Sequence, residues 1–564
     1  MTDTRRTILL MVFLFSLFSI WDAWNRHNGH PGFFDPPAAQ PAASAAVPGG
    51  AASAATTASS PAGTATGTGT PAQPAAVSEL TVVSTDLLRA TLDSIGGSLV
   101  KLELLKHADA EDANKPVVLF DRSAQHTYIA YSGLEDVPGA GGMRSAFKLL
   151  PGARSLADGS NELVVRYESP AEGGVKLVKQ YTFVRGSYAV KVRHEVVNTG
   201  TQAVTPRLDL RIVRDNTQPA HAAPAFFGGP QSYTGPALYT STAHYQKVDF
   251  KHIDENSAEY QKSANDGWVA MVQHYFASAW ITPDALPREF YVGKSKTDPH
   301  LYEVGMRLQL GTIAPDQAKA VDSVLFAGPQ EEKKLEVLAP GLELVKDYGW
   351  VTILAKPLFW LLDKIHGIVG NWGWAIILLV VLLKAAFYWL NASAYRSMAK
   401  MKAVNPRIME MRERLKDKPQ QMQQEMMKIY REEKVNPLGG CLPILIQIPV
   451  FIALYSVLLA SVEMRGAPWV LWIHDLGKPD ALFGHVFTAP IGPLPLLMMG
   501  STLLQTWLNP TPPDPVQARL MWIMPLAFSV MFFFFPAGLV LYWLTNNLLS
   551  IAQQWFINKR LGVN

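Results

Sequence analysis

The sequence predicts a multi-domain membrane protein, in which a large all-β sandwich is followed by an α-helical polytopic membrane bundle. Three observations predict this class. Apolar residues concentrate in the first 24 positions and after residue 350. The region between them alternates apolar and polar residues, which is typical of half-buried strands. Charged residues make up 17% of the 564 residues, below the roughly 25% of soluble domains.

Composition and motifs argue against several classes of function. The formal net charge of +3 gives no support for direct nucleic-acid binding, because such domains are usually strongly basic. No phosphate-binding GxxxxGK(S/T) loop occurs, and we expect no cofactor. Cys441 is the only cysteine, and its apolar neighbours favour a small buried hydrophobe. Because no metal-ligand spacing such as HExxH occurs, we expect no metal site and interpret these histidines as strand or surface residues: His194, His221, His244, His252 and His274.

The first 24 residues predict a membrane anchor. Residues 1–6 include Arg5 and Arg6, and residues 7–24 form an apolar run. Two interpretations compete, a cleaved signal peptide and an uncleaved anchor. A signal peptide ends in a small-x-small cleavage site, whereas this run ends in SIWDAWN, which favours the anchor. The positive-inside rule then keeps residues 1–6 in the cytoplasm.

Residues 25–78 predict a disordered linker. From Pro36 to Ser78 the chain has no charged residue and consists almost entirely of Pro, Ala, Ser, Thr, Gly, Val and Gln. Such a segment cannot bury enough apolar surface to offset its ordering entropy, so we interpret it as a flexible tether.

Residues 79–340 predict a large β-sandwich, which lies outside the cytoplasm because it follows the anchor. Apolar and polar residues alternate through 190–196, 207–212 and 303–310. Many such runs, separated by Gly, Pro and Asn turns, are typical of half-buried antiparallel strands in a sandwich.

Residues 341–369 predict an amphipathic helix. Apolar residues recur at helical spacing after Pro357, with Asp363, Lys364 and His366 on the other face. This pattern suits a helix in the membrane interface, and it also suits a helix packed on the sandwich.

The part after residue 369 predicts five membrane spans, which with the anchor makes six. The predicted spans are 370–391, 438–462, 493–508, 519–535 and 537–557. Both termini then lie in the cytoplasm. Segments 392–437, 509–518 and 558–564 are cytoplasmic, and 463–492 lies outside. Residues 396–434 carry eleven Lys and Arg against six Asp and Glu, as the positive-inside rule expects.

The cytoplasmic segment 392–437 predicts an antiparallel helical hairpin that turns at KDKP. Apolar residues recur there at spacings of three and four. Methionine-rich surfaces can dock varied apolar segments, although these side chains could also just fill the hairpin seam. The candidate docking residues are Met401, Ile408, Met411, Met422 and Met426.

Lys384 is the candidate centre of the site, because a lysine within a span costs roughly 2.5–3.5 kcal/mol and needs a reason. Polar stripes on other spans suggest a shared hydrophilic groove. Its candidate residues are Lys384, Gln447, Thr502, Gln505, Asn546, Asn547, Ser550 and Gln553. Two alternatives stay open. Lys384 could snorkel to the interface, and the amides could be interhelical hydrogen bonds.

Six motifs together resemble the YidC/Oxa/Alb family of membrane protein insertases, above all its bacterial form with a large periplasmic domain. They are GNWGWAII at 370–377, the cation Lys384, SMAKM at 397–401, EKVNPLGGCLPILIQIPVF at 433–451, LWIHDL at 471–476 and FPAGLVLYW at 535–543.

The resemblance implies a five-helix core around a groove that is open to cytoplasm and lipid, together with a periplasmic β-supersandwich. It implies a Gram-negative inner membrane. Lys384 falls at the position of the groove cation, where many relatives have arginine. A threonine and a tyrosine that contact substrate in some relatives correspond to Val380 and Trp543.

The implied function is a non-enzymatic insertase and chaperone that inserts nascent membrane proteins, alone or with the Sec translocon. A ribosome or targeting factor would meet the cytoplasmic loops, and the lipid bilayer is the other partner. The first alternative is a small-solute or anion transporter that uses Lys384, although no internal repeat occurs. The second is a glycan-binding or glycan-modifying protein, which would leave the hairpin and polar stripes unexplained.

Overall fold

The computed structural model describes residues 78–561 apart from 110–111, 113, 124–125, 138–140, 143, 218–232, 284, 297, 416–417, 434–441, 487–488 and 510–514. The predicted anchor at 7–24, His221 and Cys441 therefore lie outside the described residues, as does the predicted linker apart from Ser78.

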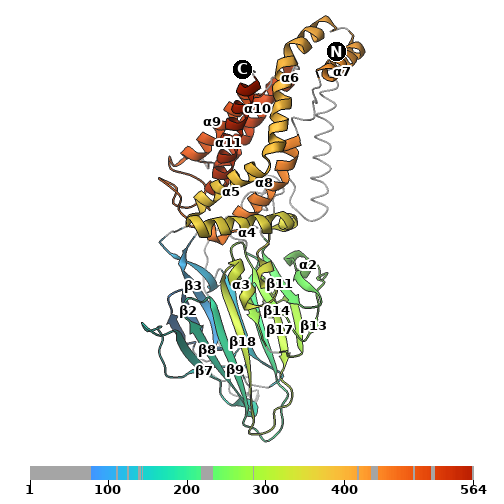
Figure 1. The fold of residues 1–564 in the computed structure, drawn as a ribbon. Coiled ribbons are helices and arrows are strands. Elements are labelled where there is room, and N and C mark those ends of the chain that lie inside the picture. Colours follow the sequence, from blue (N-terminus) through green and yellow to red (C-terminus); the bar gives the residue numbers. More distant parts are fainter. Residues whose placement is uncertain are drawn as a thin grey trace, which may run out of the picture. The chain divides into compact units, whose positions relative to one another are not determined.

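The part between Leu80 and Pro329 forms two nine-stranded sheets, and each pairing between these described strands is antiparallel. In spatial order, the first sheet contains β1 (Leu80–Ser84), β2 (Leu88–Asp93), β3 (Ser98–Ala108), β4 (Pro116–Arg122), β5 (Thr127–Glu135), β10 (Arg207–Asp215), β17 (Leu301–Gln309), β16 (Arg288–Lys294) and β13 (Ser263–Ala264). The second contains β12 (His244–Lys247), β11 (Gly235–Thr240), β14 (Trp268–Val272), β15 (Phe276–Ile281), β18 (Ala318–Pro329), β9 (Ala189–Asn198), β8 (Val175–Val184), β7 (Glu162–Glu168) and β6 (Lys148–Leu149). Figure 1 shows β7, β8, β9 and β18 side by side in the second sheet. The short helix α2 (Phe250–Asp254) follows β12.

Alternation explains why the sheets stack on one another. Along β9 the side chains of Val190, Val192 and Val196 are buried, while Lys191 and Arg193 between them are exposed. Strands of both sheets place such residues in one continuous apolar core. The predicted large β-domain is thereby confirmed.

Strand β10 differs from the expected half-buried pattern, because both of its faces are covered. Leu208 and Leu210 lie in the core, and Asp209 on the opposite face is also fully buried. The hydroxyl of Tyr291 donates to Asp209 Oδ1 at 2.6 Å, and Arg211 pairs with the same carboxylate. The prediction of a half-buried strand is therefore wrong for β10, where ion pairing compensates the burial of charge.

Two buried basic side chains lie between the sheets. Lys179 Nζ donates to the carbonyl oxygens of Gly96, at 2.6 Å, and of Ser132. His194 Nε2 lies 2.8 Å from Ser132 Oγ, and the histidine side chain is 0% exposed. His194 has the same strand parity as the core valines of β9, so it points inward. Burial lowers the pKa of Lys179 to about 7 and that of His194 to about 3.

Acid is expected to loosen this region. His194 binds its proton at about pH 3 in the folded chain but near its ordinary pKa of 6.5 when unfolded. The unfolded state therefore binds more protons between these values, so the contribution of His194 to stability is full above pH 6.5 and is lost as the pH drops toward 3. Lys179 acts in the same direction between about pH 7 and 10.5. Across its window His194 accounts for a few kcal/mol.

The measurement is hydrogen–deuterium exchange of the β8 and β9 amides in the detergent-solubilised full chain, corrected for intrinsic exchange rates. His194→Gln keeps a hydrogen-bonding group and removes the titration, so the acid sensitivity of these amides should shrink. His300→Gln, at an exposed position, serves as the matched control. Equal acid sensitivity in all three proteins would contradict the prediction.

The remaining described chain is mostly helical. Its elements are α3 (Glu332–Leu338), η2 (Leu342–Val345), η3 (Gly349–Val351), α4 (Thr352–Val369), α5 (Trp372–Ala386), α6 (Tyr388–Arg414), α7 (Pro419–Glu432), α8 (Leu442–Ala460), η4 (Val462–Met464), α9 (Pro493–Leu508), α10 (Pro515–Met531), η5 (Phe532–Phe534) and α11 (Ala537–Leu561), with a small β-ribbon of β19 (His485–Val486) and β20 (Ala489–Pro490) before α9. Helix α11 contacts α5, α6, α8 and α9, and residues of α4, α5, α8, α9 and α11 share one apolar core. Figure 1 shows α9, α10 and α11 side by side.

Local signals fix several helix ends. Gly370 ends α4 with φ of 68°, which a glycine adopts without strain. Asn371 then caps α5, because its side chain accepts a hydrogen bond from the amide of Trp374 at 3.2 Å. Helices α9 and α10 each begin at a proline, whose missing amide hydrogen costs nothing at that position.

The predicted span 370–391 is divided between two helices. Within the described ranges, no single helix is both long and apolar enough to cross a bilayer, whereas α5 and α6 pass the same test as a pair with a bend of 70° between them.

Candidate functional site

A small cavity lies where α5, α6, α8 and α11 meet. Its volume is about 40 Å³. Because a buried water needs roughly 10–15 Å³ by this measure, it has room for about three water molecules. The lining residues are Val380, Leu383, Lys384, Phe387, Leu390, Asn391, Gln447, Val450, Tyr542 and Asn546. A peptide segment could therefore use the cavity only if lining side chains or helices move, or if part of the segment stays outside.

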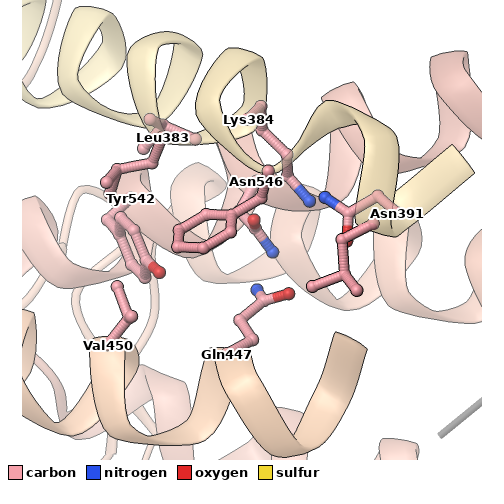
Figure 2. A pocket seen from close by; sticks show the side chains of 10 residues that line it. Leu383, Lys384, Asn391, Gln447, Val450, Tyr542 and Asn546 are labelled. Carbon is pink, nitrogen blue, oxygen red and sulfur yellow. The ribbon is translucent and has the colours of Figure 1, made fainter. Parts of the chain in front are cut away.

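Lys384 supplies the positive charge of this cavity. It lies in the last turn of α5, where the partial negative charge of the helix end favours a cation. Its Nζ donates to Ser550 Oγ of α11 at 2.7 Å, and Ser550 donates to the carbonyl of Asn546 at 2.8 Å. Figure 2 shows the amine directed toward the other polar groups. This orientation differs from that of a lysine that reaches along its own helix to a membrane interface.

Three amides surround the cation. The polar ends of Asn391, Gln447 and Asn546 converge with that of Lys384 (Figure 2). Amides donate and accept hydrogen bonds, so they can solvate either a carboxylate or a peptide group. Among the ten described lining residues none is acidic, which leaves the charge open to an anionic partner. In the described part of the chain, no cluster of three or more His, Cys, Asp or Glu is placed to hold a metal ion.

Asn391 and Tyr542 were not among the predicted groove residues. Asn391 lies seven residues after Lys384, which is about two helical turns, and this spacing is a signal that could have identified it. Tyr542 looks like an ordinary residue of an apolar run, so the sequence offers no comparable signal for it.

A second polar group lies apart from the cavity, between α9 and α11. Asn547 Nδ2 donates to Ser501 Oγ at 3.2 Å and to Thr502 Oγ1 at 3.0 Å. Gln554 Nε2 donates to Asn509 Oδ1 at 3.2 Å. These contacts correspond to the interhelical hydrogen bonds that the sequence left open as the alternative to a groove.

The other predicted residues have separate positions. Gln553 Nε2 donates to the carbonyl of Tyr388 at 3.4 Å, which joins α11 to α6. Gln505 is half-buried on α9 and is outside the cavity lining. The ring of Trp543 packs on Phe451, with centroids 4.5 Å apart. The structure therefore brings Lys384, Gln447, Asn546 and Ser550 together at the cavity, and it places the remaining predicted residues outside the cavity.

Two neighbouring asparagines offer a matched pair for a test. Asn547→Leu removes two interhelical hydrogen bonds, but Ser501 and Thr502 each also donate to the carbonyl of Met498. We expect a stability loss of about 1 kcal/mol or less and unchanged activity of the chain. The same substitution at Asn546 removes a cavity amide, so activity should fall.

The measurement is thermal unfolding in detergent, followed by the activity assay described under Proposed function, at matched protein levels. Equal activity of the two leucine variants would contradict the conclusion that Asn546 belongs to the cavity and Asn547 only to the hydrogen bonds between α9 and α11.

The predicted hairpin forms from α6 and α7, with an apolar seam between them. The five predicted docking residues all lie in this seam: Met401, Ile408, Met411, Met422 and Met426. Ile408 and Met411 are buried there. Met409 and Met427 instead face outward, each about half exposed. The outer face of α7 also carries Gln423, Gln424, Lys428 and Arg431.

Comparison with known proteins gives strong matches. A family model described as YidC periplasmic domain matches residues 80–361, and one described as 60Kd inner membrane protein matches 364–563. The chain is 52% identical to the membrane protein insertase YidC of Burkholderia cenocepacia over 567 residues, which cover 99% of each chain. It is 53% identical to that of Cupriavidus necator over 568 residues, covering 99% of this chain and 98% of the relative.

Among solved structures, the chain is similar to an active YidC insertase with the first transmembrane domain resolved. That match has 20% identity and a TM-score of 0.38, and it covers 85% of this chain and 94% of the other.

Proposed function

We propose that this chain, which belongs to the YidC family of membrane protein insertases, inserts nascent integral membrane proteins into the inner membrane and helps them fold. The observation that carries the proposal is the cavity in which Lys384 meets three amides, with no acid among its described lining residues. A half-buried cation of this kind can draw an acidic, hydrophilic tail partway into an apolar bundle.

The proposed membrane placement has six spans. They are the anchor at 7–24, then α5 with the start of α6, α8, α9, α10 and α11. Exposed apolar side chains support it, because water-exposed apolar surface of this extent is rare in soluble monomers. About half-exposed examples on four of these helices are Leu382, Leu497, Ile523, Val530 and Leu548.

Tryptophans at the helix ends support the same placement. Trp389, Trp507 and Trp555 are exposed at one end of the bundle. Trp350 and Trp374 are exposed near the other end. Such belts mark the two membrane–water interfaces. The charge distribution of the loops then orients both termini to the cytoplasm and the β-domain to the periplasm.

Helix α4 is proposed to lie in the periplasmic interface. Phe359 and Leu362 on one side pack into the bundle core with α5 and α8. Ile353, Trp360 and Ile368 on the other side are exposed. A helix with apolar residues on its outer side suits the boundary between headgroups and acyl chains.

The proposed mechanism needs no catalytic residue and no cofactor. A nascent apolar segment first meets the hairpin, whose outward side chains Met409 and Met427 are available for docking. Lys384 then attracts acidic groups in the tail, while water and amides solvate its polar groups. The segment leaves sideways into lipid, where burial of apolar surface favours it by about 25 cal/mol per Å².

Further partners belong to this proposal. The Sec translocon would share substrates with this chain in the membrane. A ribosome or targeting factor would contact the cytoplasmic loops, where Lys428 and Arg431 on α7 offer positive charge. The transporter alternative has no support from the two relatives described above, both of which are named membrane protein insertases.

The test is reconstitution of the purified full chain into liposomes, with a small single-span protein that has an acidic translocated tail as substrate. Protease protection of the tail reports insertion. Protection should exceed that in empty liposomes. Equal protection with and without the chain would overturn the proposal, and anion flux without insertion would favour a transporter.

A further inference from the structure

The segment from Gly466 to Phe483 is held at the ends of three bundle helices by hydrogen bonds and packing. The amides of Ala537 and Gly538, at the start of α11, donate to the carbonyls of Lys478 and Leu476 at 2.8 and 2.9 Å. The carboxylate of Asp480 accepts a hydrogen bond from the amide of Leu494 in the first turn of α9 at 2.9 Å.

The same segment also contacts α5. Asn371, the cap residue of α5, donates from Nδ2 to the carbonyl of Pro468 at 2.9 Å. Trp469 packs so closely on Gly373 that an added Cβ there would lie 2.2 Å from its ring. The segment is therefore held at one end of the bundle by α5, α9 and α11.

The LWIHDL motif divides its side chains between the bundle and the exterior. Ile473 and Leu476 are buried in the same apolar core as the bundle helices. Leu471, in contrast, is 79% exposed, and its φ of 56° lies in the left-handed region that a leucine rarely adopts. A strained backbone that presents an apolar side chain outward needs a compensating contact.

A second apolar tip lies further along the segment. Leu482 and Phe483 are 53% and 64% exposed. The two tips are joined at their bases by Asp480, which accepts hydrogen bonds from Trp472 Nε1 at 3.1 Å and from the amide of Leu482 at 3.3 Å. Hydrogen bonds to Asp480 therefore hold in place the loop that carries the exposed apolar residues.

The acidic groups of the segment accept hydrogen bonds from within the protein. Asp475 Oδ1 accepts hydrogen bonds from the amides of Gly466 and Gly477, both at 2.8 Å. Asp480 is buried. Hydrogen bonds therefore hold both carboxylates, while Leu471, Leu482 and Phe483 are exposed together with His474 and Lys478. This mixture of apolar and basic exposed side chains suits a membrane interface.

The apolar tips continue a surface that already faces outward from the bundle. Trp469 packs edge to face on Trp374, with ring centroids 5.8 Å apart, and Trp374 is exposed in the first turn of α5. Leu497, in the first turns of α9, is exposed as well. Tryptophan at a helix end is typical of the membrane interface.

We propose that Gly466–Phe483 is a lipid anchor, whose tips Leu471, Leu482 and Phe483 insert into the outer leaflet while its base closes the end of the bundle. The occupant of this surface is the acyl-chain boundary of the bilayer. The inference rests on the membrane placement proposed above. Insertion of the tips would hold α5, α9 and α11 at a fixed depth.

The experiment measures how deeply nitroxide labels lie when the full chain is reconstituted in liposomes. Labels are placed by L471C and F483C in a Cys441→Ser background, which removes the only native cysteine. Collision with oxygen, which concentrates in lipid, is compared with collision with a water-soluble nickel chelate. L382C on the exposed side of α5 is the lipid reference, and K191C on exposed β9 is the water reference.

Each result of the collision measurements either supports or overturns the lipid anchor. Oxygen collisions that dominate at 471 and 483, as at 382, are the expected result. Nickel collisions at 471 and 483, with 382 still in lipid, would overturn the anchor and leave the proposed function standing. Protection from both reagents at 471 and 483 would show a protein partner there and also overturn it. Nickel collisions at 382 would overturn the membrane placement itself.

Discussion

Lys384→Glu is expected to abolish insertion of a membrane protein with an acidic tail, and Lys384→Ala is expected to reduce it at least about tenfold. The cavity has one positive charge and no acid among its described lining residues. At an effective dielectric constant of about 20, unit charges 4 Å apart attract by roughly 4 kcal/mol. Loss of only about a third of that attraction, some 1.4 kcal/mol, is already a tenfold change in rate.

Lys384→Arg is expected to keep most of the activity, because arginine keeps the charge even though its donors are arranged differently. The measurement is insertion in cells depleted of the native insertase, at matched expression. Lys559→Glu, at an exposed lysine in the last turn of α11, is the matched control and should insert normally. Equal insertion by the Ala, Glu and wild-type proteins would show that the charge is dispensable.

The size of the Lys384 effect should depend on the substrate. A substrate whose translocated tail has no acidic residue gains nothing from the charge, so the Ala variant should insert it almost as well as the wild type. Higher salt should weaken the wild-type preference for acidic tails only slightly, because a charge pair in a partly buried cavity is screened much less than an exposed pair.

Patterns with a strong local cause were predictable from the sequence. The alternation through 190–196 and 207–212 indicated strands, and β9 and β10 are there. Proline, asparagine and glycine marked the ends of α4, α5 and α9. The family resemblance drawn from six motifs is confirmed by the two family models.

Tertiary features were harder to predict, because a pattern gives a face but not what covers it. Met401 and Met411 share a helix face, and only the packing of α6 on α7 shows that this face is the seam. Asn546 and Asn547 are adjacent, so on a helix they point about 100° apart and meet different neighbours. The bend at Phe387 falls between Leu383 and Asn391, where the chain has neither proline nor glycine to announce it.

Asp480→Ala is expected to destabilise the helical bundle more than any other single change in the segment between α8 and α9. The buried carboxylate accepts hydrogen bonds from Trp472 Nε1 and from the amides of Leu482 and Leu494. A buried donor left without its partner costs about 1–3 kcal/mol. The carboxylate also lies at the start of α9, where a negative charge is favourable.

The expected loss is therefore several kcal/mol, read as a lower unfolding temperature of the full chain in detergent. Asp480→Asn should fall between wild type and Ala, because the amide oxygen can still accept hydrogen bonds. Asp475→Ala is the matched control in the same segment. Its donors, the amides of Gly466 and Gly477, lie near solvent, where water can replace the carboxylate. Equal decreases in unfolding temperature for Asp475→Ala and Asp480→Ala would show that the burial of the carboxylate does not determine the loss of stability.

Gly492→Ala is expected to disrupt the same Asp480 contacts without changing Asp480 itself. A Cβ at Gly492 would lie 2.1 Å from Cγ of Asp480, so the carboxylate must move away from the start of α9. The φ of Gly492, −141°, is allowed for alanine, so backbone strain does not contribute. If the Asp480 contacts hold the segment on the bundle, Gly492→Ala should lower the unfolding temperature nearly as much as Asp480→Ala, and the double variant should lose little more. Additive losses would mean that the two residues act separately and that Asp480 is not the shared point of attachment.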